Sequence, residues 1–252
     1  MIAEFLAGVR YVLRGFALLR RPGLRRFIAI PLLINTLLFA AAAWWGWRLL
    51  EDHVLGGLPG WLQWLTWLIA PLFSVAILLV VFYTFTLLAN LIGAPFNSLL
   101  AEKVEALQGG ETPEGRAGLT ALAGEAAKSV FSELRKLLYL ALWSLPLLLL
   151  FVIPGVNAAA PFLWFAFSAW MFTLEYIDCP MGNHGHGFGR QRALLKRHRW
   201  LAWGFGSAML AMTLIPVLNF FAMPVGVIGA TLMWTERLRS ETSPALSQEA
   251  TS

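Results

Sequence analysis

The sequence predicts an all-α integral membrane protein, and three observations support this class. Of its 252 residues, 58% are hydrophobic and only 13% are charged, with a mean hydropathy of +0.67. A water-soluble domain averages about 25% charged residues. The apolar residues gather in runs of about 20, the length that crosses a bilayer as a helix, and the basic residues cluster between the runs. We expect two long transmembrane helices, two partly inserted (re-entrant) helical hairpins tipped by Pro and Asn, and amphipathic cytoplasmic helices.

Composition also excludes several classes of protein. The apolar content excludes a disordered chain, and the single cysteine, Cys179, excludes a disulfide framework. The net charge of +5 does not indicate nucleic acid as a partner, because basic residues of membrane proteins collect in cytoplasmic loops. No phosphate-binding Walker loop is present, so we expect no ATP drive and no cofactor.

Residues 1–21 are predicted to form an interfacial amphipathic helix. Its apolar positions share one helical face with arginines opposite; they are Phe5, Val9, Val12, Phe16 and Leu19. Glu4, Arg10 and Arg14 interrupt the early apolar stretch, so no signal-peptide core is expected. The N-terminus is therefore expected to stay in the cytoplasm.

Two segments are predicted to span the membrane, residues 27–50 and residues 71–92. The apolar run 27–47 would be about 31 Å long as a helix, which matches the hydrocarbon core. Pro71 opens the second span, because proline fits the first turn of a helix better than its interior. Residues 96–136 are of mixed charge and predict amphipathic cytoplasmic helices.

A weak internal repeat predicts the two hairpins, at residues 137–177 and 200–235. Ile153-Pro154-Gly155-Val156-Asn157, followed by Pro161, resembles Ile215-Pro216-Val217-Leu218-Asn219, followed by Pro224. Neither connection carries a charge, whereas basic residues flank both hairpins, so both are expected to start and finish in the cytoplasm. Residues 1–240 would then be a single membrane domain with a cytoplasmic C-terminus, followed by a polar tail at 241–252.

Length decides how deep the hairpins are expected to go. Residues 137–153 would form a helix about 26 Å long, whereas residues 225–234 would form one of about 15 Å, which is half of the hydrocarbon thickness. We therefore expect re-entrant hairpins whose uncharged tips meet protein or a water-filled cavity. The alternative is four ordinary spans joined by short turns.

The segment from Pro22 to Phe27 has the chemistry of an oxyanion site. Pro and Gly precede a helix whose first N–H groups are free, and two arginines, which can bind an oxyanion with two parallel hydrogen bonds, follow. The alternative is that Arg25 and Arg26 set the topology or contact lipid headgroups.

A pore would also need polar residues along the spans. The candidates are Asn35, Asn90, Asn97 and Glu102. Hydrogen bonding between helices is the alternative role for the asparagines. Glu102 and Glu105 are expected on a solvated helix face, and residues 183–186, which include His184 and His186, in a flexible loop that holds no metal. No catalytic residues are found, so we do not expect an enzyme.

Several motifs occur in an order that resembles the CysZ family of bacterial sulfate transporters. They are Pro22-Gly23-Leu24-Arg25-Arg26-Phe27, Pro31-Leu32-Leu33-Ile34-Asn35, Trp61-Leu62-Gln63-Trp64-Leu65, Ala94-Pro95-Phe96-Asn97 with Leu99-Leu100-Ala101-Glu102, Leu163-Trp164-Phe165 with Ser168-Ala169-Trp170-Met171, Tyr176-Ile177-Asp178-Cys179-Pro180 with Asn183-His184, and Ile215–Asn219 with Met223-Pro224-Val225 and Gly229-Ala230-Thr231. The resemblance covers nearly all of residues 1–240.

This resemblance implies sulfate uptake across the bacterial inner membrane, through a channel or a proton-coupled permease that supplies cysteine synthesis. It also implies a homo-oligomer, regulation by sulfite, and sulfate binding by Gly23, Leu24, Arg25 and Arg26. The alternative function is that of a non-transporting membrane organiser or assembly factor, since the wider family includes eukaryotic endoplasmic-reticulum proteins.

Overall fold

The computed structural model describes most of the chain as helices arranged in two compact units. It describes residues 1–21, 23–49, 52, 67–68, 71–72, 74–76, 79, 96–109 and 119–242, without the side chains at 28, 31, 32, 35, 38 and 119–133. These residues contain no strand, which confirms the all-helical class for the described part of the chain. One unit comprises Met1–Arg25 with Asn97–Ser252, and the other Arg26–Phe96.

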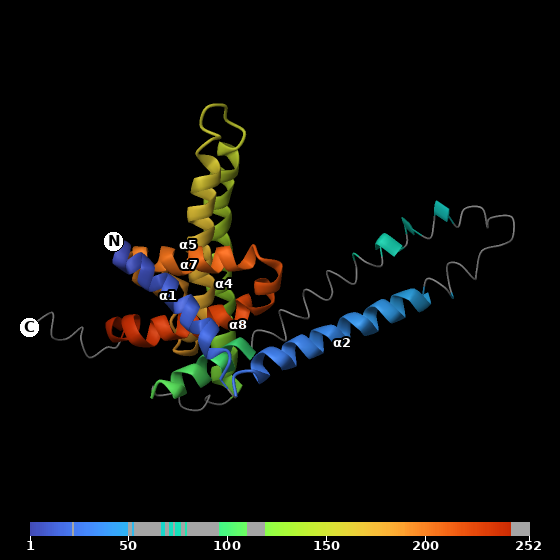
Figure 1. The fold of residues 1–252 in the computed structure, drawn as a ribbon, viewed down its shortest axis with the longest axis horizontal. Helices are drawn as coiled ribbons and strands as arrows, with labels where there is room; N and C mark the ends of the chain where they lie inside the picture. Colours follow the sequence, from blue (N-terminus) through green and yellow to red (C-terminus); the bar gives the residue numbers. More distant parts are fainter. Residues whose placement is uncertain are drawn as a thin grey trace, which may run out of the picture. The chain divides into compact units, whose positions relative to one another are not determined.

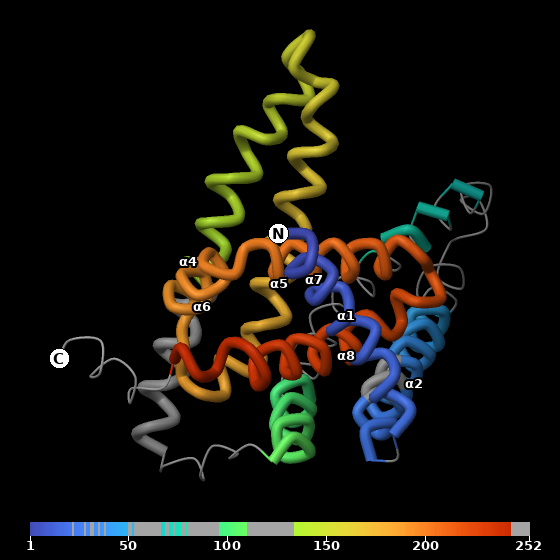
Figure 2. Tube along the Cα trace, turned by 60° about the vertical axis from the view of Figure 1, so that its left-hand side comes forward, coloured from blue at the N-terminus to red at the C-terminus, as the bar shows by residue number. Residues whose placement is uncertain are grey.

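The N-terminal helix α1 (Ile2–Leu18) packs against protein along the apolar face that the sequence predicts. It contacts α7 (Arg199–Thr213) and α8 (Pro216–Met233), and it crosses both of them in Figure 2. Val12 and Leu19 are buried by this packing. A Cβ added to Gly8 would meet the backbone of α7, so glycine is what lets the helices approach closely.

Helices α4 (Leu119–Leu150) and α5 (Ala160–Asn183) lie side by side as an antiparallel pair (Figure 1). The turn between them, residues 151–159, contains Gly155 with a φ of +84°. Helix α4 runs without a break through residue 137, where the sequence predicted that a new element starts. The distal part of the pair exposes many large apolar side chains, among them Leu142, Trp143, Leu145, Leu148, Leu149, Phe151, Val152, Ile153, Phe162, Leu163 and Phe165.

The short helix α6 (Phe188–Arg197) connects α5 to α7, and α8 continues into a π-helical turn η3 (Trp234–Leu238) and a 3-10 turn η4 (Arg239–Thr242). The length argument, which took residues 225–234 as this arm of the second hairpin, is wrong. Helix α8 starts at Pro216 and continues through Pro224, so its 18 residues are about 27 Å long. Among the described residues, Pro216–Thr242 is the one helical stretch long and apolar enough to cross a membrane, and 67% of its apolar window is buried inside the protein.

Helix α2 (Arg26–Leu49) belongs to the other unit and covers most of the first predicted span. Its 24 residues are about 36 Å long, and Leu33, Leu37 and Trp44 are more than half exposed. The second predicted span, residues 71–92, lies largely outside the described residues.

Ion pairs join the two ends of the larger unit. The Arg14 guanidinium donates to both carboxylate oxygens of Glu236, at 2.7 and 2.6 Å, and the Tyr11 hydroxyl donates to the same carboxylate at 3.1 Å. About two turns before Tyr11 on α1, Glu4 accepts a hydrogen bond from Arg237 at 3.0 Å. The N-terminal helix is therefore held to η3 by charged contacts and to α7 and α8 by glycine packing.

Candidate anion-binding site

The chain turns between α1 and α2 at the residues predicted to bind an anion. Gly23 has a φ of +96°, a backbone conformation that strains any residue with a Cβ. The backbone N–H of Leu24 donates to the carbonyl oxygen of Arg21 at 3.2 Å, and the Leu24 side chain is 1% exposed. The buried Leu24 side chain thus anchors the turn, and Gly23 provides the positive φ that the turn requires.

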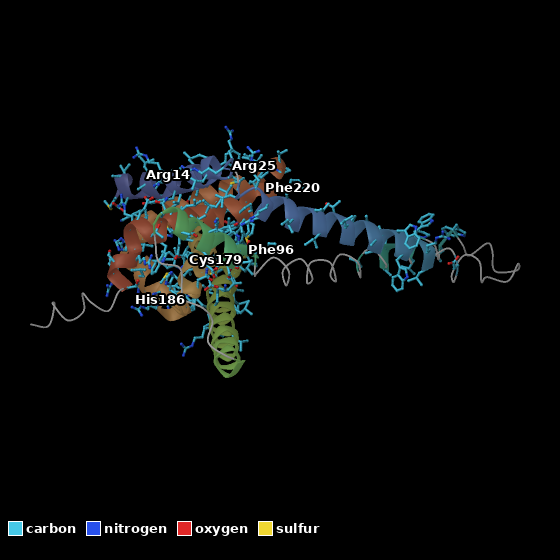
Figure 3. All side chains as sticks on the ribbon, turned by 90° about the horizontal axis from the view of Figure 1, so that it is seen from below. Arg14, Arg25, Phe96, Cys179, His186 and Phe220 are labelled. Carbon is cyan, nitrogen blue, oxygen red and sulfur yellow. The ribbon has the colours of Figure 1, made fainter. Side chains whose placement is uncertain are left out.

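Arg25 follows this anchor and is exposed (Figure 3). Its Nε atom donates to the backbone carbonyl of Arg20 at 3.2 Å. In the described part of the chain this is the one polar contact of the Arg25 guanidinium, so both terminal nitrogens retain the paired donors that match an oxyanion edge. The turn therefore fixes the position of Arg25 through Nε alone.

Arg26 is the first residue of α2, and its guanidinium lies 5.2 Å from the centroid of the Phe27 ring. The free N–H groups of the first turn of α2 therefore come directly after Arg25 in the sequence. The boundary between the two compact units falls between Arg25 and Arg26.

Two of the four predicted pore residues lie on the helix at residues 96–107. Asn97 and Glu102 are both half-buried there. Asn35 lies in α2, but its side chain is outside the described residues, as is the whole of Asn90.

A buried contact between a carboxylate and an imidazole, made by Glu105 on the same helix, corrects the prediction of a solvated acidic face. The Glu105 side chain is 0% exposed, and its Oε2 atom lies 2.8 Å from Nε2 of His184, next to the C-terminal end of α5. The other carboxylate oxygen, Oε1, is buried without a hydrogen-bond partner among the described residues. Sequence reasoning missed this pair because its two residues are 79 positions apart.

A second polar cluster joins α4, α5 and α6 at the end of the α4–α5 hairpin away from its tip. The Lys136 ammonium lies 3.0 Å from Glu175 and 3.3 Å from Asp178, and the lysine side chain is 8% exposed. The Gln191 amide nitrogen donates to Asp178 at 2.6 Å and to the backbone carbonyl of His186 at 2.7 Å. These contacts balance the charge of a lysine that would otherwise be buried alone.

The loop at residues 183–187 is held by contacts that the sequence did not predict. The Asn183 amide donates to the carbonyl of Ser98 at 3.0 Å, and the rings of His184 and His186 both pack on Trp234. Burial, followed by the nearby charge of Arg190 and the proximity of His184, lowers the pKa of His186. No group of three His, Cys, Asp or Glu side chains among the described residues is placed to hold a metal ion.

Comparison with known proteins identifies the family. Residues 11–224 match the family described as Sulfate transporter CysZ/Etoposide-induced protein 2.4. The chain belongs to this family. The resemblance predicted from the sequence motifs is therefore confirmed.

Individual relatives match over almost the whole chain. The sulfate transporter CysZ of Pectobacterium atrosepticum is 43% identical over 239 residues, which are 93% of this chain and 86% of the relative. The sulfate transporter CysZ of Salmonella typhimurium is 41% identical over 93% of this chain and 94% of its own. Both relatives are named as transporters, not as enzymes.

Proposed function

We propose that this protein carries sulfate across the bacterial inner membrane without ATP, and that Gly23, Leu24, Arg25 and Arg26 bind the anion. The observation that carries the proposal is the exposed Arg25 guanidinium, held by its Nε atom on a turn that only glycine readily adopts. The names of the relatives supply the identity of the anion. The sulfate would serve cysteine synthesis.

The chemistry of the turn suits a dianion. Two parallel N–H donors of a guanidinium match two oxygens of sulfate, and such charge-assisted hydrogen bonds are about twice as strong as neutral ones. These donors replace part of the water around the anion, and the guanidinium charges offset its negative charge.

The exposed apolar surface of α4 and α5 supports insertion of this pair into the membrane as a re-entrant hairpin. From Leu137 to Leu150 the α4 arm is about 21 Å long, shorter than the hydrocarbon core of about 30 Å. Its tip at Pro154 and Gly155 is uncharged. In this arrangement residues 1–240 form one membrane domain with both termini in the cytoplasm, and Asn35, Asn90, Asn97 and Glu102 line the path of the anion.

Membrane potential limits the mechanism to two forms. Moving a charge of −2 inward against about 100 mV costs about 5 kcal/mol. A channel therefore fills the cell only while internal sulfate is consumed, whereas a permease can offset this cost by carrying protons.

The test is sulfate flux into liposomes that contain the purified full chain. The variant Arg25→Ala/Arg26→Ala removes two cations from the turn, and the matched control Arg10→Ala/Lys103→Ala removes two exposed cations elsewhere. We expect labelled sulfate to enter with the unmodified chain and the control, and uptake by the turn variant to fall at least tenfold. Uptake no faster than in protein-free liposomes would refute the proposal.

A second measurement separates the two mechanisms. Uptake is repeated with an imposed pH gradient and then after a protonophore collapses that gradient. With the membrane potential clamped by potassium and valinomycin, a permease loses the stimulation when the gradient collapses, whereas a channel gives equal rates under both conditions.

A further inference from the structure

Helix α6 presents one buried face and one cationic face. Its buried residues, Phe188, Gln191, Leu194 and Leu195, pack into the larger unit. Arg190, Lys196 and Arg197 are exposed, and Arg199 is exposed just beyond the end of the helix. The cations extend over about 10 Å between residues 190 and 197 and do not converge on one point.

Few carboxylates neutralise this face. The sequence contains no acidic residue between Asp178 and Glu236. Glu241 reaches back to α6, where its carboxylate lies 2.6 Å from His198 and 3.7 Å from Arg197. One carboxylate among five cations at positions 190, 192, 196, 197 and 199 leaves a strong excess of positive charge.

This cationic face lies where the apolar surface of the hairpin begins. The ring of Tyr139 on α4 packs 5.6 Å from Phe188, and the Arg192 guanidinium lies 4.6 Å from the Tyr139 centroid. Exposed Leu142 and Trp143 follow within about one turn of α4. Figure 2 shows α6 against the end of the hairpin away from its tip. Cations and an aromatic ring beside an apolar surface are the pattern of a membrane interface.

We propose that α6 binds anionic phospholipid headgroups at the surface of the membrane into which the α4–α5 hairpin inserts. Lys196 and Arg197 contact the phosphates, and Arg192 on Tyr139 positions the helix at headgroup depth. Arg190, whose guanidinium donates to the carbonyl oxygen of Thr242 at 2.7 Å, adds its positive charge to the same face. The inference rests on the membrane insertion in the proposed function. Headgroups fit better than a single small anion, because the cations are spread along the helix instead of converging.

The test measures lipid binding by the full chain after removal of native lipid in detergent. Phosphatidylglycerol or phosphatidylcholine is added, and bound lipid is counted by native mass spectrometry. We expect selective binding of phosphatidylglycerol. Lys196→Ala/Arg197→Ala should weaken this binding roughly 30-fold, because each cation near an anionic surface contributes about fivefold. Arg10→Ala/Lys103→Ala is the matched control, and the charge-conserving Lys196→Arg/Arg197→Lys should bind as the unmodified chain does.

Three results would overturn the inference. They are equal binding of the two lipids, equal losses in the two alanine variants, and displacement of phosphatidylglycerol by millimolar inorganic phosphate, which would indicate a small-anion site. Depth is tested separately with a spin label at Ala193 on the exposed side of α6, in a Cys179→Ser background. We expect the label at headgroup depth in phosphatidylglycerol bilayers, and a label that lies fully in water would contradict the inference.

The same preparations separate this inference from the proposed function. If sulfate flux is absent but phosphatidylglycerol binding depends on Lys196 and Arg197, the transport proposal fails alone. If flux is present and phosphatidylglycerol binding is unchanged by Lys196→Ala/Arg197→Ala, the α6 inference fails alone.

Discussion

The Nε2 atom of His184 lies 2.8 Å from the carboxylate of Glu105, whose side chain is fully buried. This pair connects the helix at residues 96–107 to the end of α5. Because the His184 ring also packs on Trp234, one imidazole joins three segments that are far apart in the sequence. Removing either partner therefore tests how the polar interior of the larger unit is held together.

We expect His184→Ala to be more destabilising than Glu105→Gln. The first change leaves a carboxylate buried without its partner, which costs about 3 kcal/mol or more. The second change removes the charge and keeps the volume and a hydrogen-bonding group. Thermal unfolding of the detergent-solubilised chain gives the comparison, and a Glu105→Gln variant with the lower Tm would contradict it.

The lowered pKa of His186 predicts a loss of stability in acid. The folded protein binds a proton at His186 less readily than the unfolded chain does, so the free energy of unfolding decreases as the pH falls through the ordinary histidine value of about 6.5. We expect the Tm to fall more between pH 7.5 and 5.5 in the unmodified chain than in His186→Gln. Equal changes in the two proteins would show that His186 titrates as it does in water.

Two glycines offer a matched pair of substitutions. A Cβ at Gly206 on α7 would overlap the carbonyl of Ala169 and approach the Thr173 hydroxyl, whereas one at Gly189 on α6 would meet nothing within 4 Å. We expect Gly206→Ala to cost about 3 kcal/mol, and Gly189→Ala to be neutral or stabilising by up to about 1 kcal/mol. The Tm of each variant and its recovery as a monodisperse species test this.

The Arg14–Glu236 pair predicts a measurable but modest coupling. The two side chains are 46% and 31% exposed, so solvent screens their attraction despite the bidentate geometry. A double-mutant cycle with Arg14→Ala and Glu236→Ala should give about 0.5–1 kcal/mol. That value should decrease in high salt. A coupling unaffected by salt would mean that packing, and not charge, connects these helices.

The sequence predicted the helical class and a helix that begins just after Pro22 and Gly23, because composition and helix-start residues are local signals. It predicted the apolar face of α1 but not what covers it. Val12 and Leu19 satisfy the same periodic pattern whether lipid or α7 and α8 lie opposite. Gly8 and Gly15 indicate that another helix packs against this face, because a Cβ at either position would overlap α7 or α8. This is seen only once the positions of those helices are known.

The internal repeat shows a second limit of local reasoning. Gly155 and Val217 occupy matching positions of the two repeats, but Gly155 takes a positive φ in a turn, whereas Val217 lies in the first turn of α8. A β-branched residue cannot readily adopt the turn conformation, so the second repeat continues as helix from Pro216. Likewise, no pattern within residues 96–107 indicates that Glu105 will meet His184.

The contacts between α1 and η3 also determine when the protein can finish folding during its synthesis. Arg14 and Glu236 are 222 residues apart, and a ribosome adds about 5–20 residues per second. The first helix therefore waits roughly 10–45 s before its binding surface on the last helices emerges. During that time its glycine-lined face needs temporary cover, which bilayer lipid or a chaperone at the translocation site would supply.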